Sequence, residues 1–414
     1  MKFNSSIRLG VAALVLLSCA LVAVSSDLQL AVAGSVALYE DNSSLSLCNS
    51  SLNQSDDPEM ISDRAYLRGS NLSGCNLADM HMNQSDLRGT YLRGSNLSGS
   101  YLRSAWLDGA DLACAKFVNA DLTGAVLKAA NMTGSDLRNA TLVKAQLSSA
   151  NLFRADLKNC DLTEADLSDS YIADADLTNA RLFRTDLSGA NLKGIYLISA
   201  NLIGAHISWA DMEGAYLSKG QFSRAELYGA SLQGADLSNA DFTRAYLMRS
   251  NLTGANMKWA SLDYSDLTEA KLAGASMVSA KLQYADLTRA DLTGADLTDA
   301  DLSAARLMGS TLSHVKLNRV TLREIDLRGV NLSGASLRDS SLVTIFLTDA
   351  EMRNADLKDA TLNQVEISGA DLRGANLEGI RYDQFSLYSL SKAKLEGAKM
   401  SENLRTDLKG ISDR

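Results

Sequence analysis

The sequence predicts an all-β solenoid, a chain wound into stacked coils, on the strength of two repeating patterns. From Leu67 to Leu387 an apolar residue stands at every fifth position, which gives 65 pentads, 52 of them centred on Leu. Two residues before the centre, 55 of the 65 pentads carry Ala, Ser, Gly, Cys or Thr. A register held through so many repeats indicates a repeat architecture and not a single globular core.

A period of five fits neither of the ordinary elements. On an α-helix, residues five apart point about 140° away from each other, and on a flat strand they alternate between faces. One interior can collect all the central residues only where the chain turns between pentads. Every fourth pentad, counted from the one centred on Leu72, has Gly two residues after its centre in 11 of 16 cases, against 2 of 16 in each of the next two classes. Because Gly accommodates a positive φ, we expect four pentads per coil, with one side turning differently from the others.

The pentads resemble those of a known family. Ala-Asp-Leu-Thr-Gly (290–294), Ala-Asp-Leu-Ser-Asn (235–239) and Ala-Asn-Leu-Lys-Gly (190–194) are similar to the units of the pentapeptide-repeat family. The resemblance implies a right-handed quadrilateral parallel β-helix, in which the central residue and the small residue two before it point inward. The other three residues of each pentad then point outward. We expect about 16 such coils over residues 65–389, with short helical or irregular caps.

Residues 1–26 are typical of a signal peptide or an N-terminal membrane anchor. Lys2 and Arg8 accompany an uncharged apolar run, Leu9 to Val24, that is short for a membrane span. A cleaved signal is the main interpretation, and a lipid anchor at Cys19, an uncleaved anchor and a buried mature helix are the alternatives. We therefore expect an exported protein, in the periplasm, the thylakoid lumen or the extracellular space, or one associated with a membrane through its N-terminus.

Residues 27–64 are predicted to form an N-terminal cap and a linker. Asp27 to Glu40 is fairly apolar and suits a segment that covers the first coil, whereas Asp41 to Asp57 is rich in Ser and Asn. Asp57-Pro58-Glu59 resembles a helix start, with Asp as the cap and Pro at the first position, so we expect one helical turn there.

The inward positions become bulkier toward the C-terminus, which predicts coils that are wider or differently turned. Of the ten bulky residues in the position two before the centre, eight lie at or beyond Val315: Val315, Val320, Ile325, Val330, Ile345, Val365, Ile380 and Phe385.

After Leu387 the register breaks, and residues 393–395 and 398–400 resume it with a three-residue offset. Ser401 is then the expected cap of a short helix that ends near Lys409, with Gly410 as its C-terminal stop. We interpret residues 390–414 as a structural cap, with a dimerisation element as the alternative.

The sequence shows no constellation of residues that suggests catalysis, a metal site or a cofactor. His81, His206 and His314 fall several coils apart and in different classes of pentad, so they cannot converge on one site. Asp recurs just before the central Leu as part of the repeat itself. The net charge of −9 gives no reason to expect binding to nucleic acid.

Two further sets of polar residues have structural interpretations. Asp136, Asp156 and Asp176 stack in successive coils, and we interpret them as a solvated face on which Arg138 and Lys158 offset the repulsion.

Cys75 and Cys160 occupy inward small-residue positions about four coils apart, beyond disulfide reach, so both are interpreted as small buried hydrophobes. Only Cys48 lies in a flank where a flexible chain could find a partner.

The strongest candidate for partner recognition is a column of outward residues two positions after the centre. Every twentieth residue of this column gives Lys144, Glu164, Arg184, Gly204, Arg224, Arg244, Tyr264 and Tyr284. A second aromatic pair, Tyr196 and Tyr216, is expected to stack on another side, with Trp259 not far along it. The candidate partner-binding residues are therefore Arg184, Arg224, Arg244, Tyr264, Tyr284, Tyr196, Tyr216 and Trp259. Stabilisation of neighbouring coils is the competing interpretation.

These observations predict a non-enzymatic, exported, rod-like scaffold or protein-binding solenoid without a cofactor. The resemblance also includes cytosolic family members that mimic DNA and bind a type II topoisomerase, and a modulator of that kind is the alternative. Those members are shorter and dimeric and carry a concentrated acidic stripe, whereas acids and bases mix on every side of this chain. An enzyme is the third hypothesis and has no residues to support it.

Overall fold

A computed structural model describes residues 63–412 of the chain. The predicted signal or anchor, the Ser- and Asn-rich linker and the helical turn at residues 57–59 lie outside the described residues. The chain divides into two compact units, Met1–Tyr196 and Leu197–Arg414, and each is described by itself.

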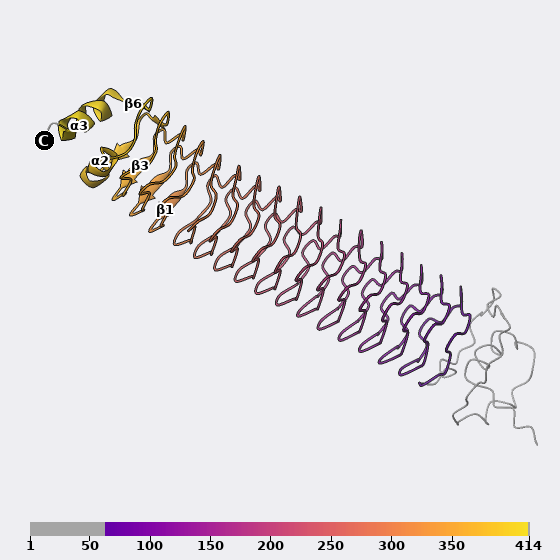
Figure 1. Ribbon diagram of the computed structural model, residues 1–414. Helices are drawn as coiled ribbons and strands as arrows, with labels where there is room; N and C mark the ends of the chain where they lie inside the picture. The colour runs from indigo at the N-terminus through magenta and orange to yellow at the C-terminus, as the bar shows by residue number, and fades with distance from the viewer. Residues whose placement is uncertain (1–62, 413–414) are drawn as a thin grey trace, which may run out of the picture. The chain divides into compact units, whose positions relative to one another are not determined.

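Both units are wound into stacked coils (Figure 1). In the first unit each bridging residue pairs in parallel with the residue 20 positions later, from Tyr66 with Asp86 to Asp176 with Tyr196. The same spacing runs through the second unit from Asn201 onward. The bridging residue is always the one just before a pentad centre, so the predicted coil of four pentads is confirmed.

Nearly every side of a coil ends in the same tight turn, and the exceptions are the corners at Glu324, Thr344 and Gln364. The residue two after the centre has a φ between 53° and 73° at each corner, from 69 to 194 in the first unit and from 199 to 379 in the second. The next inward residue closes the turn through its backbone N–H, as Ser70 N donates to Leu67 O at 3.1 Å. A closed four-residue turn with a positive φ only at its third residue is a type II β-turn.

The expectation that the Gly-rich side turns differently is therefore wrong. Gly, Asn, Arg, Tyr and Trp all occupy corners with the same backbone conformation.

The interior of each unit is filled by the pentad centres and the small residues before them, as predicted. In the second unit, the rings of Phe222 and Phe242 stack inside with their centroids 4.6 Å apart. Several inward serines donate to a carbonyl nearby, as Ser95 Oγ does to Leu92 O at 2.7 Å, so that the buried hydroxyl has a partner, whereas Ser135 Oγ has none among the described residues. Burial of each Leu contributes about 1.5–3 kcal/mol of transfer free energy.

The Asp or Asn before each centre has a local role in shaping the turn. Its Oδ1 accepts a hydrogen bond from the backbone N–H two residues later, as in Asp296 with Thr298 (3.1 Å) and Asn331 with Ser333 (2.9 Å). Such Asx-turns are a common reason for Asp and Asn to precede a corner. The recurrence of Asp in the repeat thus has a structural cause.

Later coils of the second unit carry regular strands on one side. The strands β1 (Thr321–Arg323), β2 (Ser341–Val343), β3 (Thr361–Asn363) and β5 (Arg381–Tyr382) form a parallel sheet in the order β1-β2-β3-β5. Ile325, Ile345 and Val365 follow the first three strands as buried residues, and β-branched side chains favour extended backbone. These coils are differently turned on this side, as predicted. The corners at Glu324, Thr344 and Gln364 keep a positive φ, but the usual turn hydrogen bond does not close them, and Val365 N donates instead to Ser386 Oγ at 3.0 Å.

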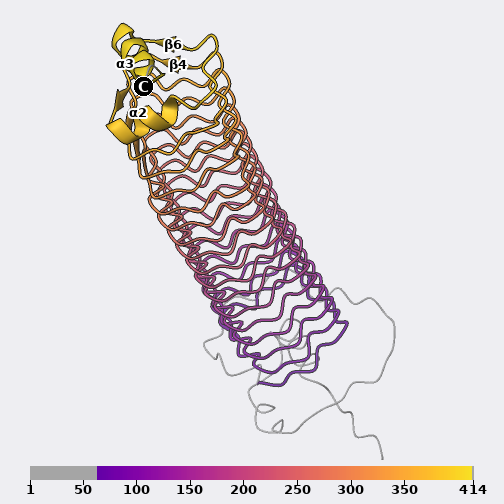
Figure 2. The same cartoon turned by 60° about the vertical axis from the view of Figure 1, so that its left-hand side comes forward.

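The repeat ends in a helix that the sequence reasoning did not predict (Figure 2). The helix α2 (Gln384–Leu390) is capped by Asp383, whose side chain accepts a hydrogen bond from Ser386 N at 2.8 Å. The prediction placed Phe385 inside the last coil, and this is wrong because Phe385 lies on α2 with its side chain exposed. The cap formed by Asp383 thus ends the last coil and starts a helix. Leu387 keeps the spacing of five and is buried, but it lies on this helix.

The offset repeat beyond α2 is confirmed. Lys394 pairs with Asp371, and β6 (Lys399–Met400) pairs in parallel with β4 (Asn376–Leu377). The helix α3 (Glu402–Ser412) follows Ser401 as predicted, and its Leu404 is buried.

The predicted end of α3 is wrong, because Gly410 is helical and has no positive φ. None of the helices within residues 63–412 has the length and apolarity needed to cross a membrane.

Candidate partner-binding surface

Corner side chains lean toward the next coil. A methyl group on Gly99, Gly189 or Gly229 would collide with the side chain 20 positions earlier, which is that of Asp79, Asp169 or Trp209. The corner residues of each unit therefore form columns in which each side chain reaches the next corner. Columns without Gly therefore present a continuous line of side chains, whereas the Gly corners at 254, 274 and 294 interrupt theirs.

Four of the predicted residues share one column, which we call the Arg/Tyr corner: Arg224, Arg244, Tyr264 and Tyr284. The rings of Tyr264 and Tyr284 stack with centroids 4.9 Å apart and planes 9° apart. The guanidinium of Arg244 lies over the ring of Tyr264 at 5.6 Å. Both tyrosines are about half exposed, at 53% and 54%. The expected stacking is confirmed, and the role of this corner in recognition stays a prediction.

Arg224 and Arg244 also differ from neighbouring arginines in their electrostatics. Arg249 and Arg289 both pair with Glu269, at 2.7 and 3.7 Å. Among the residues that the structure describes, no carboxylate forms an ion pair with Arg224 or Arg244. Two like charges on adjacent coils, about 4.8 Å apart, repel each other, so this corner is ready to accept an anionic group.

The remaining candidates lie apart from this corner. Arg184 belongs to the first unit, where its guanidinium lies over the ring of Phe183 at 5.0 Å. Tyr196 is the last residue of that unit, whereas Tyr216 and Trp259 belong to the second. All three of these aromatic side chains are exposed, and their role in recognition stays a prediction.

Sequence reasoning missed a second aromatic cluster on the second unit. The ring of Trp209 meets that of Tyr228 edge-on, with centroids 5.1 Å apart and planes 81° apart. Arg249 donates from Nη1 to the Tyr228 hydroxyl at 2.9 Å and from Nε to Glu269 at 2.7 Å. A column read every 20 residues from Trp209 does contain Arg249 and Glu269. Tyr228 stands one residue before its corner, so the contacts run diagonally between columns and escape a column-by-column reading.

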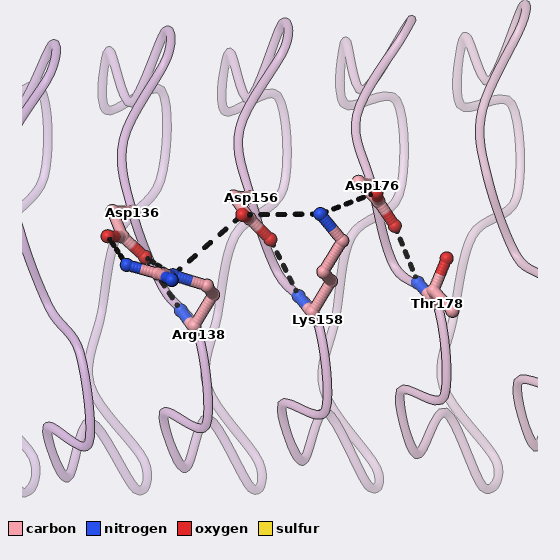
Figure 3. A network of polar contacts seen from close by, with 6 residues as sticks. All are labelled: Asp136, Arg138, Asp156, Lys158, Asp176 and Thr178. Carbon is pink, nitrogen blue, oxygen red and sulfur yellow. Dashed lines mark hydrogen bonds and ion pairs between the residues drawn. The ribbon is translucent and has the colours of Figure 1, made fainter.

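The stacked aspartates of the first unit are neutralised by interleaved bases, as predicted (Figure 3). Arg138 pairs with Asp136 at 2.7 Å and with Asp156 at 3.8 Å, while Lys158 reaches Asp156 at 3.5 Å and Asp176 at 2.9 Å. The hydrogen-bonded guanidinium of Arg138 lowers the pKa of Asp136 below its ordinary value. The arrangement is an exposed alternation of charges and not a concentrated acidic stripe.

The three histidines have separate local surroundings. His81 stacks on Tyr101 with ring centroids 4.5 Å apart. His206 Nδ1 faces Glu226 Oε2 at 3.0 Å, and His314 stands at a different corner. Within residues 63–412, no three side chains of His, Cys, Asp or Glu gather into a group that could hold a metal ion.

The cysteines divide into three environments. Cys75 and Cys160 point inward and are 2% and 0% exposed, as predicted. Burial raises the pKa of the Cys160 thiol, which is free, as is the exposed thiol of Cys114. Cys75 is disulfide-bonded, so the interpretation of it as only a small hydrophobe is wrong. Cys19 and Cys48 lie outside the described residues.

Models of known protein families match most of the described chain. The model for pentapeptide repeats matches in 8 copies, over residues 63–99, 105–142, 145–182, 180–218, 205–244, 221–263, 240–277 and 265–309. The model for a pentapeptide repeat region matches residues 295–372. The chain therefore belongs to the pentapeptide-repeat family, and its coils form a right-handed β-helical solenoid. No curated protein matches the chain.

Solved structures of pentapeptide-repeat proteins are similar to parts of the chain. HetL, involved in heterocyst differentiation regulation in the cyanobacterium Nostoc sp. strain PCC 7120, is 27% identical over 60% of this chain and 89% of HetL, with a TM-score of 0.25. QnrB1, a plasmid-mediated fluoroquinolone resistance protein, is 16% identical over 55% of this chain and 92% of its own, with a TM-score of 0.24. A thylakoid-lumen protein of Arabidopsis thaliana is 31% identical over 28% of this chain and 72% of its own, with a TM-score of 0.14. Likeness at these TM-scores supports no conclusion about function.

Proposed function

We propose that this chain is a non-enzymatic, exported scaffold or protein-binding solenoid whose main recognition surface is the Arg/Tyr corner. The observation that carries this proposal is the pair Arg224 and Arg244, which lack an ion-pair partner among the described residues and adjoin two exposed, stacked tyrosines. Tyr and Arg are enriched at the energetic centres of protein interfaces. A backbone fixed by hydrogen bonds between coils presents them with little ordering cost on binding. Arg184, Tyr196, Tyr216 and Trp259 are secondary candidates.

Two features support export. The basic start and the apolar run of residues 1–26 have the composition of a signal or an anchor. The disulfide at Cys75 is typical of proteins in oxidising compartments. We therefore place the protein in the periplasm, the thylakoid lumen or the extracellular space, either released or held at a membrane by its N-terminus.

The charge distribution favours this proposal over a DNA-mimicking modulator of a type II topoisomerase. A DNA mimic needs an uninterrupted line of negative charge, as on a duplex backbone. The stacked aspartates of the first unit, in contrast, alternate with Arg138 and Lys158 (Figure 3). Arg224 and Arg244, which have no ion-pair partner within residues 63–412, also favour a protein-binding surface over a DNA mimic.

Cross-linking in the native compartment tests the proposal. Arg224, Arg244, Tyr264 and Tyr284 are replaced together by Ser, and the cross-linked proteins are compared with those of the wild type. Recognition at this corner predicts a loss of partners with a melting temperature close to that of the wild type. A large drop in melting temperature with the same partners retained would leave the corner as a purely structural ladder.

A matched control and a fractionation complete the test. Asp299 and Arg319 form an exposed ion pair at another corner of the same unit, at 2.6 Å, and their replacement by Ser should leave the partners unchanged. Fractionation with N-terminal sequencing of the mature chain checks export. A cytosolic, uncleaved chain would revive the topoisomerase alternative.

A further inference from the structure

One side of the second unit carries both aromatic clusters on five successive coils. On each coil this side is a segment of six residues between two corners: 204–209, 224–229, 244–249, 264–269 and 284–289. Parallel bridges hold the segments in register, from His206 with Glu226 to Asp266 with Asp286. We call this surface the aromatic side. The Arg/Tyr corner is one of its borders, and the column of Trp209 and Arg249 is the other.

Large hydrophobic side chains are exposed across the whole width of the aromatic side. Trp209 is 64% exposed on one border, Tyr264 and Tyr284 lie on the other, and Tyr246 is 54% exposed between them. Contiguous exposed aromatic surface bordered by polar residues is a mark of an interaction site. The exposed aromatics are part of one surface here and not scattered singly.

The five segments of the aromatic side carry four arginines and four carboxylates, so the positive excess is local and confined to the Arg/Tyr corner. Of the carboxylates between the borders, Asp286 pairs with Arg306 at 3.4 Å. Arg249 and Arg289 are matched by Glu269, and His206 faces Glu226. Arg224 and Arg244 have no such match within the part of the chain that the structure describes. A carboxylate placed between them would form charge-assisted hydrogen bonds and relieve their mutual repulsion. The complementary ligand is therefore anionic at this border.

The orientation of the tyrosine rings indicates what kind of anion fits. Arg244 covers the face of Tyr264 on one side, and Tyr284 covers it on the other. Tyr264 therefore offers no open aromatic face on which a sugar ring could stack. The exposed parts are the ring edges and hydroxyls, which donate hydrogen bonds to carbonyl groups. Carboxylates and backbone carbonyls together are the groups of an acidic peptide.

We propose that the aromatic side binds an extended acidic segment of a partner protein that runs along the Arg/Tyr corner. This inference rests on the proposed function of the solenoid as a protein-binding surface. Carboxylates of the segment pair with Arg224 and Arg244, and its backbone carbonyls accept hydrogen bonds from the hydroxyls of Tyr264 and Tyr284. From Arg224 to Tyr284 the corner spans about 14 Å, which about four extended residues cover. An apolar side chain of the segment lies on Tyr246, which stands two residues after Arg244 on the same coil.

Direct binding of synthetic peptides to the full mature chain tests the inference. The probe is a fluorescein-labelled peptide of repeated Glu-Leu-Glu-Ser, compared by fluorescence anisotropy with the same peptide carrying Gln for Glu. We expect the Glu peptide to bind more tightly and to lose affinity in about 1 M NaCl, which screens charges beyond about 3 Å. Equal binding of the two peptides, or tighter binding of polygalacturonate, a polyanionic glycan, would overturn the inference.

Variants assign the binding to the Arg/Tyr corner. Arg224→Gln with Arg244→Gln should raise the Kd of the Glu peptide by about tenfold. Tyr264→Phe with Tyr284→Phe keeps the stacked rings and removes only the hydroxyls, so a several-fold loss there reports hydrogen bonding and not folding. Arg319→Gln, at a paired corner elsewhere on the unit, is the control and should leave the Kd unchanged.

The failure of this inference can be told apart from the failure of the proposed function. A Glu peptide that does not bind the wild type overturns the inference. The proposed function still stands in that case if cross-linked partners are lost in the Ser variant of the Arg/Tyr corner. Full affinity of the Arg224→Gln, Arg244→Gln variant for the Glu peptide would also overturn the inference.

Discussion

The indole ring of Trp209 occupies the space that a side chain on Gly229 would need, because a methyl group on Gly229 would come within 2.5 Å of Cζ3 of Trp209. Gly274 has an almost identical φ, 66° against 65°, yet a methyl group there would meet nothing within 4 Å. The two glycines therefore separate the cost of the corner conformation from the cost of a blocked neighbour.

We expect Gly229→Ala to destabilise the second unit more than Gly274→Ala does. Ala in the left-handed conformation costs about 1 kcal/mol, and Ala304 already stands at such a corner. Gly274→Ala should therefore lower the free energy of unfolding by about 1 kcal/mol. Gly229→Ala should add the displacement of Trp209, to be measured by chemical denaturation.

Fluorescence provides an independent readout of the same displacement. In a background with Trp106→Phe and Trp259→Phe, emission comes from Trp209 alone, and Gly229→Ala should shift it. Equal stability of the two Gly variants with unchanged Trp209 emission would show that the contact between Trp209 and residue 229 does not contribute to stability.

Deletion of residues 237–241 should be tolerated better than deletion of residues 237–240. Loss of a whole pentad brings Phe242 to the centre after Asp236 and leaves all later residues paired 20 apart. Loss of four residues instead places Asp241 at the inward centre, and an unpaired buried carboxylate costs several kcal/mol. Thermal melting checks the order, and equal losses would contradict the equivalence of the corners.

Thiol alkylation should distinguish the two free cysteines. Cys114 is exposed and should react quickly in the native protein. Cys160 is buried and its pKa is raised, so it should stay protonated and react only after unfolding. Mass spectrometry after timed alkylation gives the two rates, with Cys114→Ser as the control that removes the fast reaction. Fast native modification of Cys160 would contradict its inward placement.

The carboxylate ladder of the first unit should weaken only in acid. Because Arg138 lowers the pKa of Asp136 below the ordinary value of 3.8, the unfolded chain takes up a proton at higher pH than the folded chain. Stability from this pair is complete above that ordinary value and is lost as the pH falls through the folded pKa.

Arg138→Gln tests this linkage directly. It should move the titration of Asp136 upward toward its ordinary range, which carbon-13 NMR of labelled aspartate can follow. Asp326, which bonds Arg328 in the same way, is the internal reference and should not move. An unchanged titration of Asp136 would show that Arg138 does not set its pKa.

The sequence was sufficient to predict the coil, because residues repeated strictly every five positions can all point inward only if the chain turns after each pentad. The sequence did not predict the corner conformation correctly. Gly is more frequent on one side of the coil, but it adopts the same φ as the other residues that occupy corners. Arg224 and Trp259 adopt the same φ as glycines, at 59° and 57°. At the C-terminal end the spacing of five persisted into α2, and the cap formed by Asp383 decided the structure instead.

Among the candidate site residues, contacts within one column were predictable from the sequence, and contacts that run diagonally between columns were not. Tyr264 and Tyr284 stand in one column, so their contact follows from the period alone. The contacts of Tyr228 with Trp209 and Arg249 depend on how long side chains reach across a side, which depends on rotamers and not on register.

The uniform corner has a consequence for how such a chain can evolve. Because the recurring turn accepts Gly, Asn, Arg, Tyr or Trp with a similar φ, unequal recombination between repeats can add or remove multiples of five residues where this turn occurs. Gene duplication can thus lengthen either unit while mutation rewrites its outward residues one at a time. Selection for a new partner and selection for foldability then act on different positions of the same pentad.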